Sequence, residues 1–409
     1  MAELVDAHDS NSCVARRVGS IPTSGTKTSF LLERGFFHLF DYFSKVQNSL
    51  YQIALSLIPK IGPIKAKSLI SHIGSAEQVF KEDKSTLGKV SGVGSFFLKD
   101  FNPKELLLRA ERELNFIEKN NVSCLYYKNE DYPSKLREAI DSPIVLYTKG
   151  NIDFSRKNIA IVGTRKATAY GKSLTQQFIS DLTEHNVNIV SGLAYGIDIE
   201  AHKAALSYNI PTIGVFARGL DAIYPAPHRP IANEMLETGG WVTEFLSETP
   251  GDASFFVKRN RIVAGICETT VVVESAQKGG SLITAGLAND YNRDVFAFPG
   301  DITREYSKGC NMLIQKNRAH LLTSAQDLID ILGWQTPLKQ NVFQTNLFLE
   351  LTEDEQKIID ILKDKGALHV DPLTNLANMS ISVMSVNLFN LEMKGGIRAL
   401  AGKRYEVNG

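Results

Sequence analysis

The hydrophobic pattern between residues 158 and 206 contains the same unit twice. A continuous apolar run at residues 159–162 ends at Gly163 and is followed by apolar residues at helical spacing. A second run at residues 187–190 ends at Gly192 and again leads into a helical segment. Continuous short apolar runs are typical of parallel strands that are buried on both faces. The pattern therefore predicts two strand–loop–helix units, with both glycine loops at one edge of a sheet.

Four more apolar runs extend this pattern, at residues 212–216, 241–245, 270–273 and 295–298, with helical segments between most of them. Strand-like segments at residues 124–127 and 143–147 precede the first core strand. Strands that alternate with helices predict one parallel sheet covered on both faces. We predict an α/β fold with a Rossmann-like parallel sheet core, in a domain that spans residues 123–334.

The chain on either side of this core is predicted to be mainly helical. Residues 47–122 contain two helical segments joined by a glycine turn at Gly62, a weaker echo of that turn at residues 90–94, and an amphipathic stretch at residues 103–119. These features predict a helix–hairpin–helix or SAM-like domain. Its turn could offer N–H groups to a phosphate, but the second copy has no basic turn, so a packing role is favoured.

The C-terminal part begins with a polar linker at residues 335–349. In residues 350–409, Thr352 and Glu355 have the spacing of a capping box at the start of a helix. Two more helices at residues 371–379 and 380–394, followed by a hairpin at residues 395–407, predict a winged helix. Lys394 is the only basic residue of the presumed recognition helix, which favours protein contact or dimer support over DNA reading.

Residues 1–46 are polar and show no sustained hydrophobic period. The first 27 residues resemble the accidental translation of a transfer-RNA gene. This segment is therefore interpreted as a disordered or misassigned N-terminal extension, with a true start near Val46 or Leu50.

Composition narrows the function classes only moderately. Lys and Arg together number 45, as do Asp and Glu, so a nucleic-acid surface must be a local patch. The four cysteines are far apart and form no CxxC pair, which favours reduced thiols over a metal site. No apolar run approaches the roughly 18 residues of a membrane span. We expect a soluble cytoplasmic protein without a membrane partner, a metal or a cofactor.

Candidate chemistry lies in the loops where the predicted strands end. These loops are rich in glycine and in arginine or lysine, at residues 163–165, 192–196, 218, 255–261, 278–281 and 299–300. Glycines let a backbone approach a phosphate closely, and guanidinium groups give it paired donors. The chain has neither a full GxGxxG after the first strand nor a GxxxxGK[ST] motif, so dinucleotide and triphosphate binding are disfavoured.

Other interpretations of these residues stay open. The basic residues at 258–261 could be an ordinary charged helix face, and Phe256 could belong to the core. Asp198, Glu200 and His202 could form an acid/base set, but helical spacing spreads them over different faces, so Asp198 is interpreted as a helix cap. Glu274 is predicted to brace the loop at residues 279–281 and not to catalyse. No catalytic residue is predicted.

Taken together, six blocks of residues resemble the DNA-processing protein A family, also called DprA or Smf, of bacterial natural transformation. The resemblance runs from about residue 47 to the C-terminus. The blocks are residues 161–165; 191–198 with His202; 219–221 with 224–225; 258–265; 273–274 with 279–285; and 298–300. The resemblance implies single-stranded DNA binding without sequence preference, protection of incoming DNA, RecA loading onto it, and a homodimer formed through the Rossmann-like domain. It implies no catalysis.

The resemblance also assigns roles to individual residues. Arg165 would hold phosphate, the basic residues of 258–261 would line the same pocket, and Phe256 would stack a base, worth about 1–3 kcal/mol. Thr164 stands where many family members have serine. The resulting set of DNA-binding residues is Gly163, Thr164, Arg165, Ser191, Gly192, Gly196, Phe256, Lys258, Arg259, Asn260, Arg261, Lys278, Gly279, Gly280 and Ser281.

Two other functions compete with this interpretation. Lysine-decarboxylase-like phosphoribohydrolases use the same type of sheet, but they carry a PGGxGT loop followed by a catalytic glutamate. Residues 278–284 do not fit that loop, and no glutamate follows before Glu305. A passive interaction scaffold that works through its winged helix is the third hypothesis.

Overall fold

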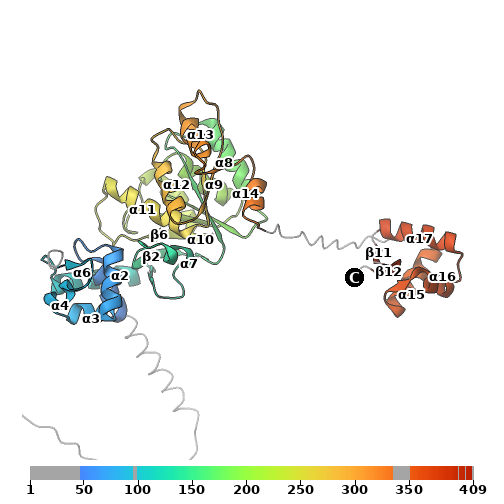
Figure 1. Cartoon of the computed structure of the whole chain (residues 1–409), viewed down its shortest axis with the longest axis horizontal. Coiled ribbons are helices and arrows are strands. Elements are labelled where there is room, and N and C mark those ends of the chain that lie inside the picture. The colour runs from blue at the N-terminus through green and yellow to red at the C-terminus, as the bar shows by residue number, and fades with distance from the viewer. Residues whose placement is uncertain (1–46, 95–98, 335–350, 395, 401, 408–409) are drawn as a thin grey trace, which may run out of the picture. The chain divides into compact units, whose positions relative to one another are not determined.

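The computed structural model describes residues 47–94, 99–334, 351–394, 396–400 and 402–407. They belong to two compact units that divide between residues 336 and 337 (Figure 1). The interpretations of residues 1–46 and 335–349 lie outside the described residues.

The first unit is organised around a nine-stranded sheet with the order β1-β2-β6-β5-β4-β3-β7-β8-β9. Seven of its strands, β3 to β9, are mutually parallel, which confirms the predicted Rossmann-like core. The strands are β1 (Ser123–Tyr126), β2 (Val145–Gly150), β3 (Lys157–Val162), β4 (Val187–Ser191), β5 (Thr212–Val215), β6 (Gly240–Thr243), β7 (Thr269–Val272), β8 (Asp294–Ala297) and β9 (His320–Leu321).

One edge of the sheet differs from the prediction of a wholly parallel sheet. Strand β2 pairs antiparallel with β6, and β1 pairs antiparallel with β2. The apolar runs of these two strands resemble those of the core, because both are largely buried. Strand direction depends on the partner across the ladder, which a single run does not specify.

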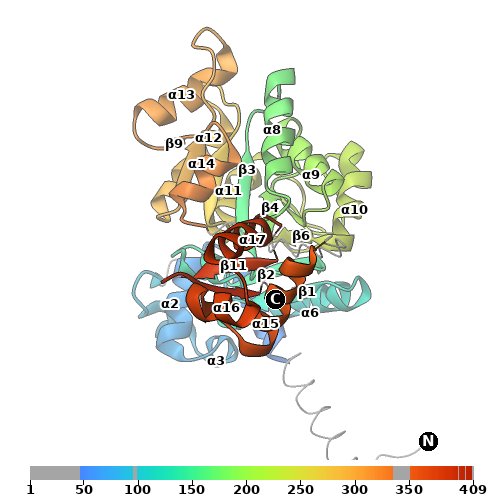
Figure 2. The same ribbon diagram turned by 90° about the vertical axis from the view of Figure 1, so that its right-hand side faces the viewer.

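Alternating residues of each strand face different helical layers, as the pleat of a strand requires. On β3, Ile159 and Ile161 pack with α8 (Ala169–Asp181) and α9 (Ile197–Ser207). Ala160 and Val162 pack on the other side, with α11 (Ala253–Ile266), α12 (Gly280–Asp290) and α13 (Lys308–Gln315). Figure 2 shows α8 and α9 on one side of β3 and α11 on the other. The remaining helices of this layer set are α7 (Ser134–Glu138), α10 (Arg229–Thr238) and α14 (Ala325–Ile331), with 3-10 turns η1 (Ala226–His228) and η2 (Glu305–Ser307).

The strand order reverses beside β3. The chain runs from β3 through β4 and β5 to β6 on one side, and then continues with β7, β8 and β9 on the other side. Loops after β3 and β7 therefore leave the sheet in opposite directions. Such a switch point leaves a crevice beyond the carboxyl ends of the strands, where ligands of α/β proteins bind.

The helical segment before the sheet packs against its antiparallel edge. Residues 47–56 are helical, followed by α2 (Pro63–Ile73), α3 (Ala76–Lys81), α4 (Lys84–Gly88) and α6 (Pro103–Lys119). Their apolar core is continuous with Tyr147 and Trp241 of the sheet. Glu113 of α6 is 2% exposed and accepts hydrogen bonds from the Ser247 amide at 3.0 Å and its hydroxyl at 2.6 Å. The helix–hairpin–helix assignment itself stays a prediction.

The second unit is the predicted winged helix. It contains α15 (Glu353–Lys365), β10 (Leu368–His369), α16 (Val370–Ala377), α17 (Ile381–Met393), β11 (Ile397–Leu400) and β12 (Arg404–Val407). The capping box of Thr352 and Glu355 is present. Lys394, the C-cap of α17, pairs with Glu355 at 2.6 Å.

Candidate nucleic-acid interface

The loops after β3 and β4 pack backbone against backbone. Gly196 has a φ of +83°, and a Cβ there would lie 2.1 Å from the Thr164 carbonyl oxygen. A Cβ on Gly163 would lie 2.4 Å from Cγ1 of Ile197. The Ile197 amide donates to the Thr164 carbonyl at 3.1 Å. Only glycine fits at these contacts, which place the exposed Arg165 at the carboxyl edge of the sheet.

Glu274, just after β7, fixes the same loop and the helix that follows it. Its carbonyl oxygen accepts from the Thr164 amide at 2.8 Å. Its carboxylate accepts from the Thr168 amide at 2.9 Å and from the Thr168 hydroxyl at 2.5 Å. Thr168 is the N-cap of α8. Both carboxylate oxygens are therefore engaged at the start of α8. The prediction that Glu274 braces the loop at residues 279–281 is wrong, because its carboxylate holds Thr168 after β3 instead.

Helix α11 presents its charged residues in two directions. Arg259 and Asn260 line a cavity at the switch point, whereas Lys258 and Arg261 line a different cavity beside the helical segment. Arg261 pairs with Glu244 and donates to the Asp141 carbonyl oxygen. The expectation that residues 258–261 line one pocket is therefore wrong. Successive helical residues are about 100° apart, so four in a row cannot share a face.

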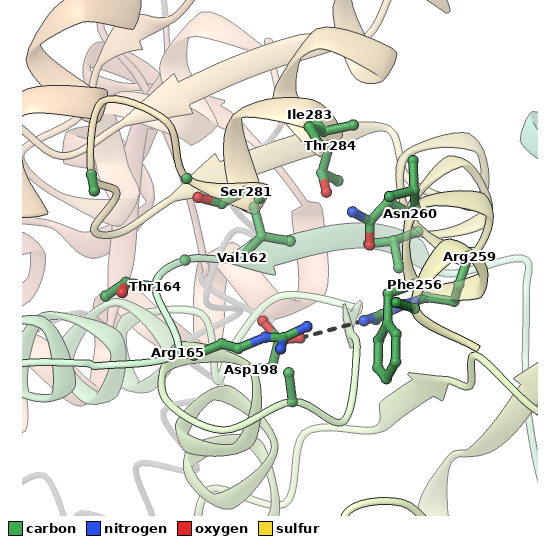
Figure 3. Close-up of a pocket in the computed structure, with 18 residues that line it drawn as sticks. Val162, Thr164, Arg165, Asp198, Phe256, Arg259, Asn260, Ser281, Ile283 and Thr284 are labelled. Carbon is green, nitrogen blue, oxygen red and sulfur yellow. Dashed lines mark ion pairs between the residues drawn. The ribbon is translucent and has the colours of Figure 1, made fainter. Parts of the chain in front are cut away.

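The cavity at the switch point, called here the crevice pocket, has a volume of about 310 Å³. Figure 3 shows Arg165, Asp198 and Arg259 converging in it, with Phe256 beside them. Its lining residues are Val162, Gly163, Thr164, Arg165, Ala194, Asp198, Ala253, Phe256, Val257, Arg259, Asn260, Val263, Ala276, Gly279, Gly280, Ser281, Ile283 and Thr284. The Arg165 guanidinium lies 5.2 Å from the centre of the Phe256 ring.

Arg259 forms the floor of the crevice pocket. It is 5% exposed, and its Nη2 lies 3.9 Å from Oδ2 of Asp198. A Cβ on Gly192 would lie 1.7 Å from Arg259 Nη1, so the glycine makes room for the guanidinium. Burial lowers the pKa of Arg259, which Asp198 opposes; burial raises the pKa of Asp198, which Arg259 opposes. With Arg165 at the rim, the pocket carries two guanidinium groups against one carboxyl group.

The opposite wall of the crevice pocket is the start of α12. No side chain caps this helix, whose N-cap is Gly279. The first N–H groups of a helix have no intrahelical acceptor and favour an anion. A Cβ on Gly280 would meet no atom within 4 Å, so the space in front of that backbone is open. The Ser281 hydroxyl donates to Ser275 Oγ at 2.9 Å and fixes the turn.

The structure divides the predicted DNA-binding residues into groups. Nine of them line the crevice pocket: Gly163, Thr164, Arg165, Phe256, Arg259, Asn260, Gly279, Gly280 and Ser281. Ser191 and Gly192 are buried, Gly196 packs on the Thr164 carbonyl, and Lys278 is exposed in the loop before α12 without lining the pocket. Sequence reasoning missed Asp198 and Thr284 as pocket residues. Both lie in blocks that carry the family resemblance, which is the signal that could have found them.

The possible acid/base set of Asp198, Glu200 and His202 is not assembled. Asp198 lies in the first turn of α9, whose N-cap is Gly196, so its interpretation as the cap is wrong. Glu200 pairs with Lys203 at 3.1 Å. His202 is fully buried, with Nε2 2.7 Å from the Gly192 carbonyl oxygen and Nδ1 2.7 Å from the Thr212 hydroxyl. The imidazole of His202 thus holds the backbone of Gly192 in place through this contact to its carbonyl oxygen.

His202 should make the stability of the protein sensitive to acid. Burial lowers the pKa of His202 from 6.5 to about 4. The unfolded chain therefore binds the proton first, and the free energy of unfolding falls as pH decreases from 6.5 towards 4, by up to about 3 kcal/mol from this group. Urea unfolding at pH 7 and pH 5 should show a smaller difference for His202→Gln than for the wild type. Equal differences would contradict this origin.

The described residues contain neither a metal-binding cluster nor a membrane-spanning helix. This part of the chain contains no group of three or more His, Cys, Asp or Glu residues that could hold a metal ion. None of its helices is long and apolar enough to cross a membrane.

Comparison with known proteins identifies the family of this chain. The family model described as DNA recombination-mediator protein A matches residues 123–333, which is more than half of the chain. The chain belongs to this family. A second model, described as the DprA winged helix domain, matches residues 349–403 of this family member.

Individual relatives agree with that membership. The chain is 30% identical to the protein Smf of Synechocystis over 87% of this chain and 98% of that protein. It is 34% identical to the protein Smf of Escherichia coli over 71% of this chain and 79% of that protein. The X-ray structure of DNA processing protein A from Streptococcus pneumoniae superposes with a TM-score of 0.58 at 31% identity, covering 69% of this chain and 97% of that chain.

Proposed function

We propose that this family member binds single-stranded DNA in the crevice pocket without sequence preference, as a recombination mediator and not as an enzyme. One observation carries the proposal. Arg165, Arg259 and the uncapped start of α12 converge on a cavity whose side wall is Phe256. Guanidinium groups and helix N-termini bind phosphate, and an aromatic ring stacks on any base.

The same geometry favours single strands over duplexes. A base can stack on Phe256 inside the crevice pocket only when it is unpaired, because neighbouring base pairs cover the ring faces of the bases in a duplex. The groups in the pocket contact either a phosphate or the face of a base. Neither kind of contact depends on which base is present. Contact through phosphates predicts an affinity that falls with salt.

The wider role rests on family membership. We propose that the protein protects incoming single strands and loads RecA onto them during natural transformation, as a homodimer in the cytoplasm. The family description as a recombination mediator supports this role. The phosphoribohydrolase alternative is disfavoured, because residues 278–284 do not fit its loop and the Glu274 carboxylate already accepts from the amide and the hydroxyl of Thr168.

Replacing Arg165 by alanine tests the proposed function directly. The Arg165→Ala protein should bind labelled oligo-dT about ten- to a hundredfold more weakly, because a charge-assisted contact to phosphate contributes about 1.5–3 kcal/mol. Fluorescence anisotropy at low and moderate salt, with oligo-dT and its duplex, measures the effect. Wild type should prefer the single strand and should bind more weakly at the higher salt.

Arg156→Ala is the matched control for charge removal. Arg156 immediately precedes β3 and so lies at the amino edge of the sheet, opposite the crevice pocket. The Arg156→Ala protein should bind oligo-dT with the wild-type affinity. If wild type binds neither DNA form, or if both variants lose affinity equally, the crevice pocket is not the DNA site.

A further inference from the structure

A second cavity adjoins the crevice pocket. This adjoining pocket has a volume of about 470 Å³ and is lined by Arg165, Phe216, Ala217, Arg218, Tyr224, Gly251, Asp252, Ala253 and Phe256. It shares Arg165, Ala253 and Phe256 with the crevice pocket. The stacked pair of Arg165 and Phe256 is therefore a common wall between the two cavities.

The adjoining pocket contains the exposed ring of Tyr224 and the guanidinium group of Arg218. Tyr224 is 57% exposed, and its ring lies 6.1 Å from that of Phe256 at an interplanar angle of 63°. The Nε of Arg218 is buried and has no hydrogen-bond partner among the described residues. An exposed tyrosine at a cavity mouth and an unsatisfied guanidinium nitrogen both lack a structural explanation here.

Backbone contacts hold Arg218 in place. The Arg218 carbonyl oxygen accepts from the Thr243 hydroxyl at 2.8 Å, directly beyond β5. A Cβ on Gly219 would lie 2.3 Å from the Leu246 carbonyl oxygen, so the chain turns tightly after Arg218. Asp252 is the one carboxylate in this lining, and it is engaged as the N-cap of α11, accepting from the Ser254 amide at 2.7 Å. Arg165 and Arg218 therefore outnumber the acidic groups.

We propose that the adjoining pocket binds the next nucleotide of the same strand, with Tyr224 stacking its base and Arg218 contacting its phosphate. This inference rests on the proposed function. The strand crosses the common wall, where Arg165 neutralises the phosphate between the two nucleotides and Phe256 stacks the base in the crevice pocket. The crevice pocket alone accounts for one nucleotide, whereas two contiguous subsites give the site a preference for connected nucleotides.

Competition by short oligonucleotides tests the second subsite. Thymidine oligonucleotides with a 5′ phosphate, from one to six nucleotides long, would displace labelled oligo-dT from wild type, Arg218→Ala, Tyr224→Ala and Tyr224→Phe. Tyr224→Ala should reduce the affinity for the trimer about tenfold through loss of one stacked base, and Arg218→Ala should reduce it about tenfold through loss of one charge-assisted phosphate contact. Both alanine variants should bind the mononucleotide with the same affinity as the wild type. Tyr224→Phe keeps the ring and should behave as wild type.

Arg229→Ala is the control, because Arg229 is exposed at the start of α10 and lines neither pocket. An unchanged trimer affinity in both alanine variants would overturn the second subsite and leave the proposed function intact. Equal losses for mononucleotide and trimer would also overturn it, since these residues would then support only the first pocket. Failure of wild type to bind oligo-dT would instead overturn the proposed function.

Discussion

Gly192→Ala is expected to abolish oligonucleotide binding, with a loss of at least about a hundredfold. The new Cβ would lie 1.7 Å from Nη1 and 2.3 Å from Cζ of Arg259, so the guanidinium must leave its position. Arg259 is 5% exposed and its guanidinium lies 3.9 Å from the Asp198 carboxylate, so any displacement takes it out of the position in which it faces the crevice pocket. The variant loses the cationic contact of Arg259. It also distorts the floor of the crevice pocket next to Arg165. Anisotropy with oligo-dT measures the loss, and circular dichroism confirms that the variant is folded.

Two further variants separate local crowding from general damage. Gly286→Ala also adds a methyl group, on α12 but outside the crevice pocket, with its nearest neighbour Arg318 Nη2 at 3.7 Å, and should keep its affinity within a few-fold of the wild type. The double variant Gly192→Ala/Arg259→Ala removes the clash, so it should recover thermal stability relative to Gly192→Ala and still fail to bind. Full binding by Gly192→Ala would show that Arg259 does not contribute from its observed position.

Glu274→Ala is expected to lower the free energy of unfolding by about 2–4 kcal/mol, since it removes two hydrogen bonds to a charged acceptor. Glu274 is 5% exposed and accepts from both the amide and the hydroxyl of Thr168. Without it, the start of α8 loses a negative charge as well as its anchor to β7. Urea unfolding monitored by circular dichroism gives the change. Glu234→Ala, at an exposed position of α10, should change stability by less than about 0.5 kcal/mol.

The same variant tests the enzymatic alternative. Neither the wild type nor Glu274→Ala should release a base from a nucleoside monophosphate. Turnover by the wild type that Glu274→Ala abolishes would overturn the non-enzymatic proposal, provided that the variant remains folded at the assay temperature.

In helix α11, the sequence predicts part of the crevice pocket correctly and part of it incorrectly. The sequence predicts that residues 258–261 bind DNA in one pocket, but only Arg259 and Asn260 of this run line the crevice pocket. The other two face away, and Arg261 is engaged with Glu244. The helical period requires such a division, but which side faces the crevice depends on how α11 packs on the sheet. Residues 253–266 carry apolar side chains on several sides of the helix. The pattern therefore does not predict which side of α11 faces the crevice pocket.

The sequence by itself determined the core strands, the helices between them, the capping box of α15 and the family. These features depend on residues close together in the chain: apolar runs that end at glycine, caps at fixed spacing, and blocks in a fixed order. Only the tertiary structure decided the antiparallel direction of β2, the burial of Arg259 against Gly192, and the pocket shared by Arg165 and Phe256. Each of these is a contact between segments far apart in the chain, and its geometry depends on how whole elements pack. Local residue patterns carry no information about that packing.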